Sequence, residues 1–104
     1  MRTTSMGSGF KIYWTDHALN ELADTYEYLE KHFTKREMKK LSVEIDKTLK
    51  LISKKPDLFP LSDSKKIRRV VIKKFNTMYY RENEGRIEIL SFFSNRQNPK
   101  KIKL

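Results

Sequence analysis

The chain has 104 residues, no cysteine and a net charge of +10, and these features exclude several classes of protein. A chain of this length has room for one small domain, and without cysteine it can form neither disulfides nor thiolate metal sites. No apolar stretch has the length of a membrane span or of a signal-peptide core, so we expect a cytoplasmic protein without a membrane partner.

The N-terminal segment precedes the first predicted element. Residues 1–9 are mostly small and polar and include two methionines and two glycines. We therefore expect a disordered leader or an expression remnant there, and we assign residues 10–104 to a single domain. Phe10 to Trp14 alternates apolar and polar side chains, which predicts a short strand. Thr15 or Asp16 can then cap a helix.

Two amphipathic helices are expected next. In the first, apolar residues recur at helical spacing over residues 18–33, and carboxylates such as Glu21 fall on the opposite, solvent-facing side. Thr34 and Glu37 have the spacing of a capping box at the start of the second helix. Pro56 ends that helix, because it restricts the residue before it. The connection is so short that the two helices must form an antiparallel hairpin.

Three β-prone segments follow a loop rich in turn residues, at residues 67–72, 75–81 and 86–93. Lys73-Lys74 predicts a tight turn or bulge between the first two, and Glu82 to Gly85 predicts a hairpin turn between the last two. The predicted fold class is therefore α+β. An N-terminal strand and an antiparallel helical hairpin precede a three-stranded antiparallel meander, and the curved sheet, antiparallel or mixed, carries the helices on one face.

Few residues offer acid–base or metal chemistry. The two histidines, His17 and His32, fall at the ends of the first helix, away from the basic half of the chain. The carboxylates of that helix lie on its solvent side, so we expect no metal site. The sequence contains no glycine-rich phosphate loop, and we expect no cofactor.

The remaining candidates are cations and aromatic rings in the second half of the chain. The first 60 residues hold 11 Lys/Arg against 9 Asp/Glu, whereas the remainder holds 12 against 4. Such an excess attracts polyanions, whether nucleic acid or an acidic protein segment. Guanidinium groups bind phosphates or carboxylates, and aromatic rings stack on unpaired bases. Because adjacent strand residues point to opposite faces, Arg68 and Arg69 cannot both contact one ligand, and one of Tyr79 and Tyr80 is expected in the core.

Several features occur together in one known family. After a long helical hairpin the sequence contains, in order, the arginine pair Arg68-Arg69, the aromatic strand Phe75 to Tyr80, the strand with Ile87, Ile89 and Leu90, and the closing segment Asn95 to Pro99. In these features residues 10–103 resemble the RelE/ParE superfamily of toxins from bacterial type II toxin–antitoxin modules, in particular the ParE-like plasmid-stabilisation branch. The resemblance implies a toxin that arrests growth, assembles with a cognate antitoxin and is neutralised by its acidic segment.

The resemblance leaves the target open. ParE-like members are associated with inhibition of DNA gyrase, whereas RelE-like members cleave mRNA on the ribosome with the help of cations and acid–base groups. Where the nuclease members carry an arginine, this chain has Asn76 after Phe75, and where several carry a His or Tyr, residues 98–100 read Asn-Pro-Lys. We therefore expect inhibition of gyrase or a similar target first. The alternatives are a ribosome-dependent mRNA endoribonuclease and a non-toxic basic relative that binds nucleic acid or antitoxin.

The sequence and the family resemblance together predict two sets of site residues, one for catalysis and one for binding. No catalytic residue is assigned with a defined role, and the cations that a nuclease mechanism would use are Arg68, Arg69, Arg81 and Arg96. The residues expected to contact the target or the antitoxin are Arg68, Arg69, Lys74, Asn76, Tyr80, Arg96 and Lys100. Arg96 matches a cationic position of the family beyond the last strand, where Asn95 and Pro99 are expected to hold it.

Overall fold

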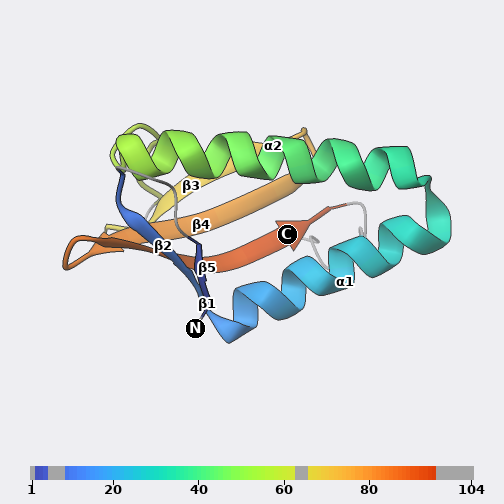
Figure 1. Cartoon of the computed structure of the whole chain (residues 1–104), viewed down its shortest axis with the longest axis horizontal. Coiled ribbons are helices and arrows are strands. Elements are labelled where there is room, and N and C mark those ends of the chain that lie inside the picture. Colours follow the sequence, from blue (N-terminus) through green and yellow to red (C-terminus); the bar gives the residue numbers. More distant parts are fainter. Residues whose placement is uncertain (1, 5–8, 63–65, 96–104) are drawn as a thin grey trace.

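The computed structural model describes residues 2–4, 9–62 and 66–95, which form one sheet and a pair of helices (Figure 1). In chain order the elements are β1 (Arg2–Thr4), β2 (Lys11–Trp14), α1 (Asp16–His32), α2 (Lys35–Lys54), β3 (Arg68–Ile72), β4 (Asn76–Asn83) and β5 (Arg86–Ser94). The predicted α+β order of strand, helical hairpin and three-strand meander is confirmed. Within the described residues, neither helix has the length and apolar content needed to cross a membrane.

The sheet is mixed, with the strand order β1-β2-β5-β4-β3. β3, β4 and β5 form the predicted antiparallel meander. β2 lies parallel to β5, with Ile12 opposite Ile87, because the helical hairpin returns the chain to the same end of the sheet. The strand that directly precedes the helical hairpin therefore pairs with β5, the last strand of the meander.

Each helix is capped by the threonine that directly precedes it. The Thr15 hydroxyl accepts a hydrogen bond from the Ala18 amide at 3.2 Å, and the Thr34 hydroxyl accepts one from the Glu37 amide at 3.3 Å. Each bond satisfies one of the amides that a helix N-terminus leaves unpaired. α2 ends at Lys54, directly before the Lys55-Pro56 pair.

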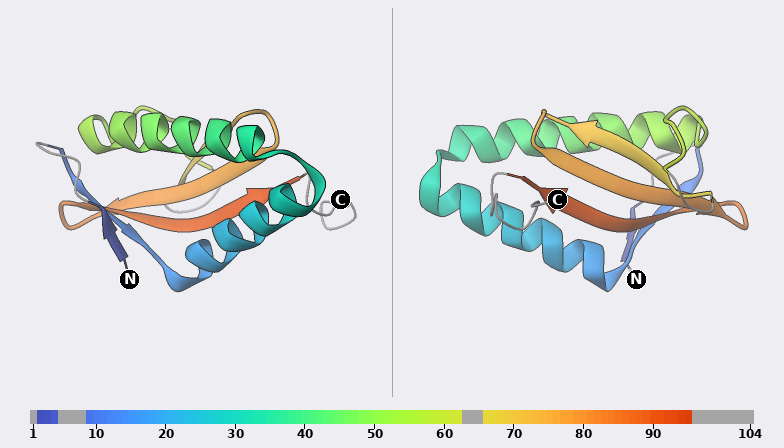
Figure 2. Two further views of the ribbon diagram at one scale, coloured as in Figure 1. Left: turned by 45° about the vertical axis from the view of Figure 1, so that its right-hand side comes forward. Right: turned by 180° about the vertical axis from the view of Figure 1, so that it is seen from behind.

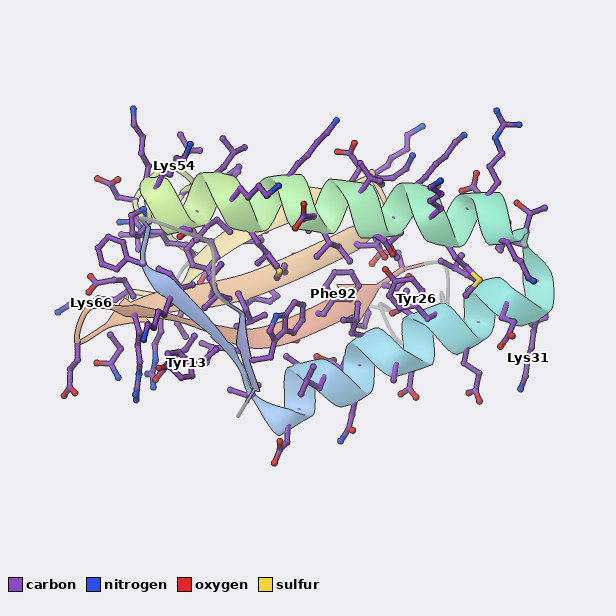
Figure 3. All side chains as sticks on the ribbon, viewed as in Figure 1. Tyr13, Tyr26, Lys31, Lys54, Lys66 and Phe92 are labelled. Carbon is purple, nitrogen blue, oxygen red and sulfur yellow. The ribbon has the colours of Figure 1, made fainter. Side chains whose placement is uncertain are left out.

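The core lies between the helical hairpin and one face of the sheet. Figure 3 shows side chains filling this layer, with Phe92 and Tyr26 labelled. The predicted stripes of both helices point into it, except for Phe33, which is 42% exposed because the backbone has already left helical geometry there. The buried apolar residues from helices and strands are Ile12, Trp14, Ala18, Leu29, Leu41, Ile45, Leu49, Ile52, Val70, Ile72, Met78, Tyr80, Ile87, Ile89 and Phe92.

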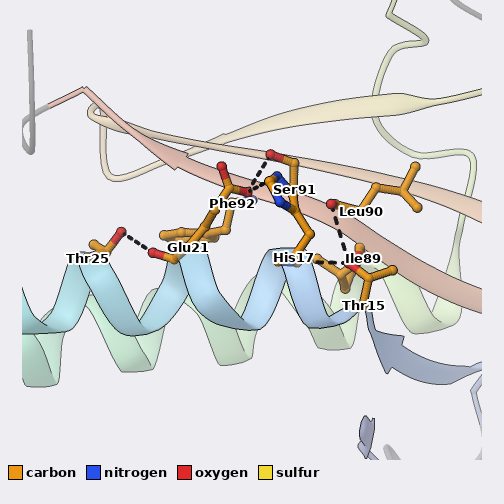
Figure 4. Close-up of polar contacts among 9 residues, drawn as sticks. Thr15, His17, Glu21, Thr25, Ile89, Leu90, Ser91 and Phe92 are labelled. Carbon is orange, nitrogen blue, oxygen red and sulfur yellow. Dashed lines mark hydrogen bonds and ion pairs between the residues drawn. The ribbon is translucent and has the colours of Figure 1, made fainter. Parts of the chain in front are cut away.

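α1 covers the edge of β5 that β2 leaves unpaired (Figure 4). β2 ends opposite Ile89, whose carbonyl accepts bonds from the Thr15 amide and hydroxyl. Further along, one Glu21 carboxylate oxygen accepts bonds from the Phe92 amide at 2.8 Å and the Ser91 hydroxyl at 2.7 Å. The prediction that Glu21 faces solvent is therefore wrong, because an open strand edge needs acceptors for its amides.

Two tight turns join the strands of the meander. Glu84 and Gly85, with φ of +52° and +78°, form a two-residue turn between β4 and β5, as a type I′ hairpin requires. The predicted turn thus holds, although Asn83 still pairs with Arg86 inside the sheet. Lys73, Lys74 and Phe75 make the turn between β3 and β4 (residues 73–75), so Phe75 precedes the strand that it was expected to open.

The first nine residues are not wholly outside the fold. Residues 2–4 form β1, which pairs antiparallel with β2. Gly9 lies against Ser53 at the end of α2. The next residue, Phe10, makes two hydrogen bonds with Ser53: its amide donates to the Ser53 carbonyl at 2.9 Å, and its carbonyl accepts from the Ser53 hydroxyl at 2.6 Å. The expectation of a leader outside the domain is therefore wrong for residues 2–4 and Gly9, because composition does not reveal pairing with a distant segment. Residues 1 and 5–8 lie outside the described part of the chain.

Candidate interaction surface on the open face of the sheet

The sheet presents one face to the helices and leaves the other uncovered. Figure 2 (right) shows the strands in front of the helical hairpin when the molecule is seen from behind. The residues on this side are those that alternate with the buried residues of each strand. We call them the open face: Lys11, Tyr13, Arg69, Val71, Thr77, Tyr79, Arg81, Arg86, Glu88 and Phe93.

The arginine pair of β3 divides between the two faces, as predicted. Arg68 lies on the helix side, where its Nη1 donates to the carbonyl of Phe59 at 2.7 Å and, at 3.4 Å, to that of Asp57. It therefore holds the loop between α2 and β3. Arg69 is exposed on the open face, opposite Tyr79 of β4.

Tyr80 and Asn76 were predicted to contact a partner, and their burial contradicts this. Tyr80 is 0% exposed and its hydroxyl donates to the Pro56 carbonyl at 2.8 Å. Burial raises the pKa of this phenol, so it stays protonated. Asn76 is also buried and donates to the Ile72 carbonyl at 3.0 Å, which closes the β3–β4 turn. Tyr79, half-buried on the open face, is the tyrosine of the pair that a partner can reach.

A carboxylate that the sequence did not single out organises one end of the open face. Glu88 has a side chain only 7% exposed, and it accepts a bond from Arg81 Nε at 2.8 Å. Arg86 contacts its other oxygen through Nε at 3.3 Å and Nη2 at 3.2 Å, while the guanidinium lies 5.2 Å from the centre of the Tyr13 ring. One feature of the sequence could have indicated this pairing. Residues 86–88 read Arg-Ile-Glu, and this spacing places Arg86 and Glu88 on one face of a strand.

The other predicted residues are separated from this cluster. Lys74 is exposed in the β3–β4 turn, where its φ of +71° places a non-glycine residue in the left-handed region. Arg96, Pro99 and Lys100 lie outside the described residues, whereas the amide of Asn95, directly after β5, donates to the Phe75 carbonyl at 2.7 Å. The structure thus brings Arg69 and Arg81 to one face, turns Arg68 to the other, and places Lys74 at the rim.

The histidines do not join the open face. His17 Nε2 lies 3.2 Å from the Glu21 carboxylate on α1, beside the edge of β5 (Figure 4). The His32 ring packs against Tyr28, with ring centroids 4.6 Å apart. Both imidazoles therefore lie on the helical side of the molecule, and within the described part of the chain no cluster of three potential metal-binding side chains occurs.

Comparison with known proteins now identifies the family. The sequence profile described as the ParE toxin of the type II toxin–antitoxin system parDE matches residues 12–99. The chain belongs to the ParE toxin family. This ParE-family chain also resembles a solved chain of the chromosomal ParDE TA system from P. aeruginosa, with a TM-score of 0.67 and 16% identity over 80% of this chain and 92% of that chain. No curated protein sequence matches it. At this identity the structural likeness shows the fold alone, and the profile shows the family.

The pairing of Glu88 predicts a contribution to the stability of this ParE-family protein that depends on pH. The hydrogen bond from Arg81 lowers the pKa of Glu88 from its ordinary value of 4.5, against the opposing effect of burial. A carboxylate with a lowered folded-state pKa stabilises the protein above its unfolded-state pKa, and this contribution is lost as the pH falls through the folded-state value. We therefore expect the free energy of unfolding of wild type to exceed that of Glu88→Gln most at neutral pH, and the difference to shrink below pH 4.5.

Urea denaturation between about pH 3 and pH 7 measures this difference. The matched control is Glu30→Gln, because Glu30 is exposed on α1. We expect its stability to follow that of wild type at each pH. A Glu88→Gln difference that does not change with pH would contradict the assigned role of the carboxylate.

Proposed function

We propose that this ParE-family chain arrests growth by binding an essential target, DNA gyrase in the first place, through the open face of its sheet. The observation that carries the proposal is that two groups suited to acid–base work, the Tyr80 phenol and the Glu88 carboxylate, are engaged within the fold. The Tyr80 hydroxyl is buried against the Pro56 carbonyl, and Glu88 is paired with Arg81 and Arg86. What the open face presents to a partner is mainly positive charge and aromatic surface, which suits binding.

The alternative, an mRNA endoribonuclease, needs a general base beside the scissile phosphate and cations around it. Arg69 supplies an exposed cation, but Arg68, which the nuclease hypothesis also used, is directed to backbone carbonyls on the other side of the sheet. This arrangement supports binding over cleavage. The two activities leave different traces in the cell, so one experiment separates them.

We further propose that a cognate antitoxin neutralises the chain by covering basic and apolar surface on α2. A hollow of about 430 Å³ lies between α2 and the β3–β4 turn. Val43, 43% exposed, contributes apolar surface there. The hollow is lined by Arg36, Lys39, Lys40, Val43, Glu44 and Lys73. Because five of these six side chains are either cationic or apolar, an antitoxin segment with alternating acidic and apolar residues complements the hollow in charge and shape.

The test combines induced expression of the chain in bacteria with a gyrase assay on the purified chain, and it has three readouts. We expect growth arrest, loss of supercoiling activity when purified chain is added to gyrase, and intact transcripts by primer extension. Cleavage at defined positions in transcripts, with supercoiling unaffected, would favour the nuclease instead. Growth that continues unchanged would contradict both and favour a non-toxic relative.

A further inference from the structure

We call Glu88 and its neighbours Arg81, Arg86 and Tyr13 the Glu88 cluster. It lies at the end of the open face that is nearest the β4–β5 turn. Sheet register places its members side by side: Glu88 lies opposite Tyr13 of β2 and opposite Arg81 of β4, and Lys11 lies opposite Arg86. Arg81 and Asn83 of β4 and Arg86 of β5 therefore contact one carboxylate, and Tyr13 of β2 lies opposite it. Since these strands are adjacent in the sheet, the arrangement depends on the fold and not on a flexible loop.

The carboxylate fixes the two guanidinium groups without exhausting their donors. Arg81 uses Nε, and Arg86 uses Nε and Nη2, for the contacts with Glu88. A guanidinium carries five N–H donors, so each arginine retains donors for a further acceptor. Their side chains are 45% and 38% exposed, which leaves both accessible, whereas the Glu88 side chain at 7% is covered.

We propose that Arg81 and Arg86, positioned by Glu88 and Tyr13, form a binding site for a phosphate group. A phosphate group has at least two unesterified oxygens on a tetrahedral phosphorus, so it can accept bonds from two guanidinium groups at once. Arg81 and Arg86 carry two positive charges, and Glu88 carries one negative charge. Exposed Lys11 adds a further positive charge nearby. The carboxylate of Glu82, near the end of β4, accepts a bond from the Gly85 amide at 3.1 Å, so it helps to shape the β4–β5 turn.

The phosphate can come from two sources: a free phosphate or nucleotide, or the backbone of a nucleic acid. The site goes beyond the proposed function, because it concerns a ligand and not the gyrase or the antitoxin. Binding is therefore measured with the purified full chain alone, so that failure of the gyrase proposal leaves the result unaffected. The probes are inorganic phosphate, a fluorescent single-stranded oligothymidylate, and an oligoglutamate peptide of matching charge.

Three substitutions test the arginines. We expect Arg81→Gln and Arg86→Gln each to weaken oligothymidylate binding about tenfold, as the loss of a charge-assisted bond predicts. Arg86→Lys keeps the charge and loses the planar fork, so it is expected to weaken binding nearly as much. The control Lys47→Gln removes one positive charge from an exposed pair with Glu44 on α2 and is expected to change affinity by less than about twofold. Thermal unfolding verifies that each variant is folded.

Glu88→Gln separates an organised site from a merely basic surface. On a basic surface, removal of a negative charge strengthens binding of a polyanion. If Glu88 positions the two guanidinium groups, its removal weakens binding although the net charge rises. Tighter binding by Glu88→Gln would therefore overturn the proposal, as would wild-type binding by Arg86→Lys.

The probes identify the source of the phosphate. Competition of inorganic phosphate with the oligothymidylate supports a site for phosphate as such, and oligothymidylate binding that only the site variants weaken supports a phosphodiester backbone. Equal binding of oligoglutamate with the same losses would overturn the proposal in favour of an acidic protein partner. Absence of binding by both phosphate probes would overturn it outright.

Discussion

Replacement of Arg69 by glutamate is expected to abolish growth arrest while the protein remains folded. Arg69 is exposed on β3, the edge strand of the open face, opposite Tyr79 of β4, the strand that also carries Arg81. Arginine is enriched among the interface residues whose loss costs about 2 kcal/mol or more, so we expect charge reversal at Arg69 to weaken target binding by about thirtyfold. The measurements are colony formation after induction and the supercoiling activity of gyrase with purified variant.

The neighbouring arginine supplies the matched control. Arg68→Gln removes a similar charge from the adjacent position, but Arg68 bonds the Phe59 carbonyl on the other side of the sheet. We expect this variant to lower the free energy of unfolding by about 1–3 kcal/mol, because a partly buried carbonyl loses a charged donor. Folded Arg68→Gln protein should still inhibit the target. If Arg69→Glu arrests growth as wild type does, the open face is not the target-binding surface.

Most of the architecture was predictable because hydrophobic periodicity reports which side of an element is buried. The stripe of α2, including Leu41, Ile45 and Ile52, lies in the core as expected. The capping threonine and the proline after the helix were also predictable, because each affects only the backbone of neighbouring residues. The parallel pairing of β2 with β5 depends on contacts between distant segments, which a local pattern does not specify.

The sequence could not assign the strand residues to a particular face. Alternation indicates that Tyr79 and Tyr80 point in opposite directions, but it does not say which is buried. That choice depends on which face of the sheet the helices cover, since Asn76, Met78 and Tyr80 alternate without interruption on the buried face. The wrong expectation for Tyr80 follows from this ambiguity. Glu88 was missed for a related reason: its importance depends on Arg81 from the facing strand.

Substitution of Gly9 by alanine is expected to destabilise the fold strongly, although Gly9 lies in a segment that composition places outside the domain. A Cβ at this position would lie 2.1 Å from the Ser53 hydroxyl oxygen and 2.8 Å from the Ser53 carbonyl oxygen. Because Ser53 is 1% exposed and its carbonyl belongs to the end of α2, the backbone itself must move. Overpacking of this kind costs about 2–3 kcal/mol, which corresponds to a fall in melting temperature of roughly 10 °C or more.

Two further variants identify the cause of this loss. Gly85→Ala is the control, because a Cβ there meets nothing within 4 Å and the cost comes only from its φ of +78°; we expect about 1 kcal/mol. Ser53→Ala removes the hydroxyl that lies closest to the new Cβ and also breaks its bond to the Phe10 carbonyl. If the clash is the cause, Gly9→Ala costs less in the Ser53→Ala background than in wild type, yet still destabilises because the Ser53 carbonyl remains. Calorimetry of the four proteins measures this coupling, and equal costs in both backgrounds would show that Gly9 does not pack against Ser53 as the structure has it.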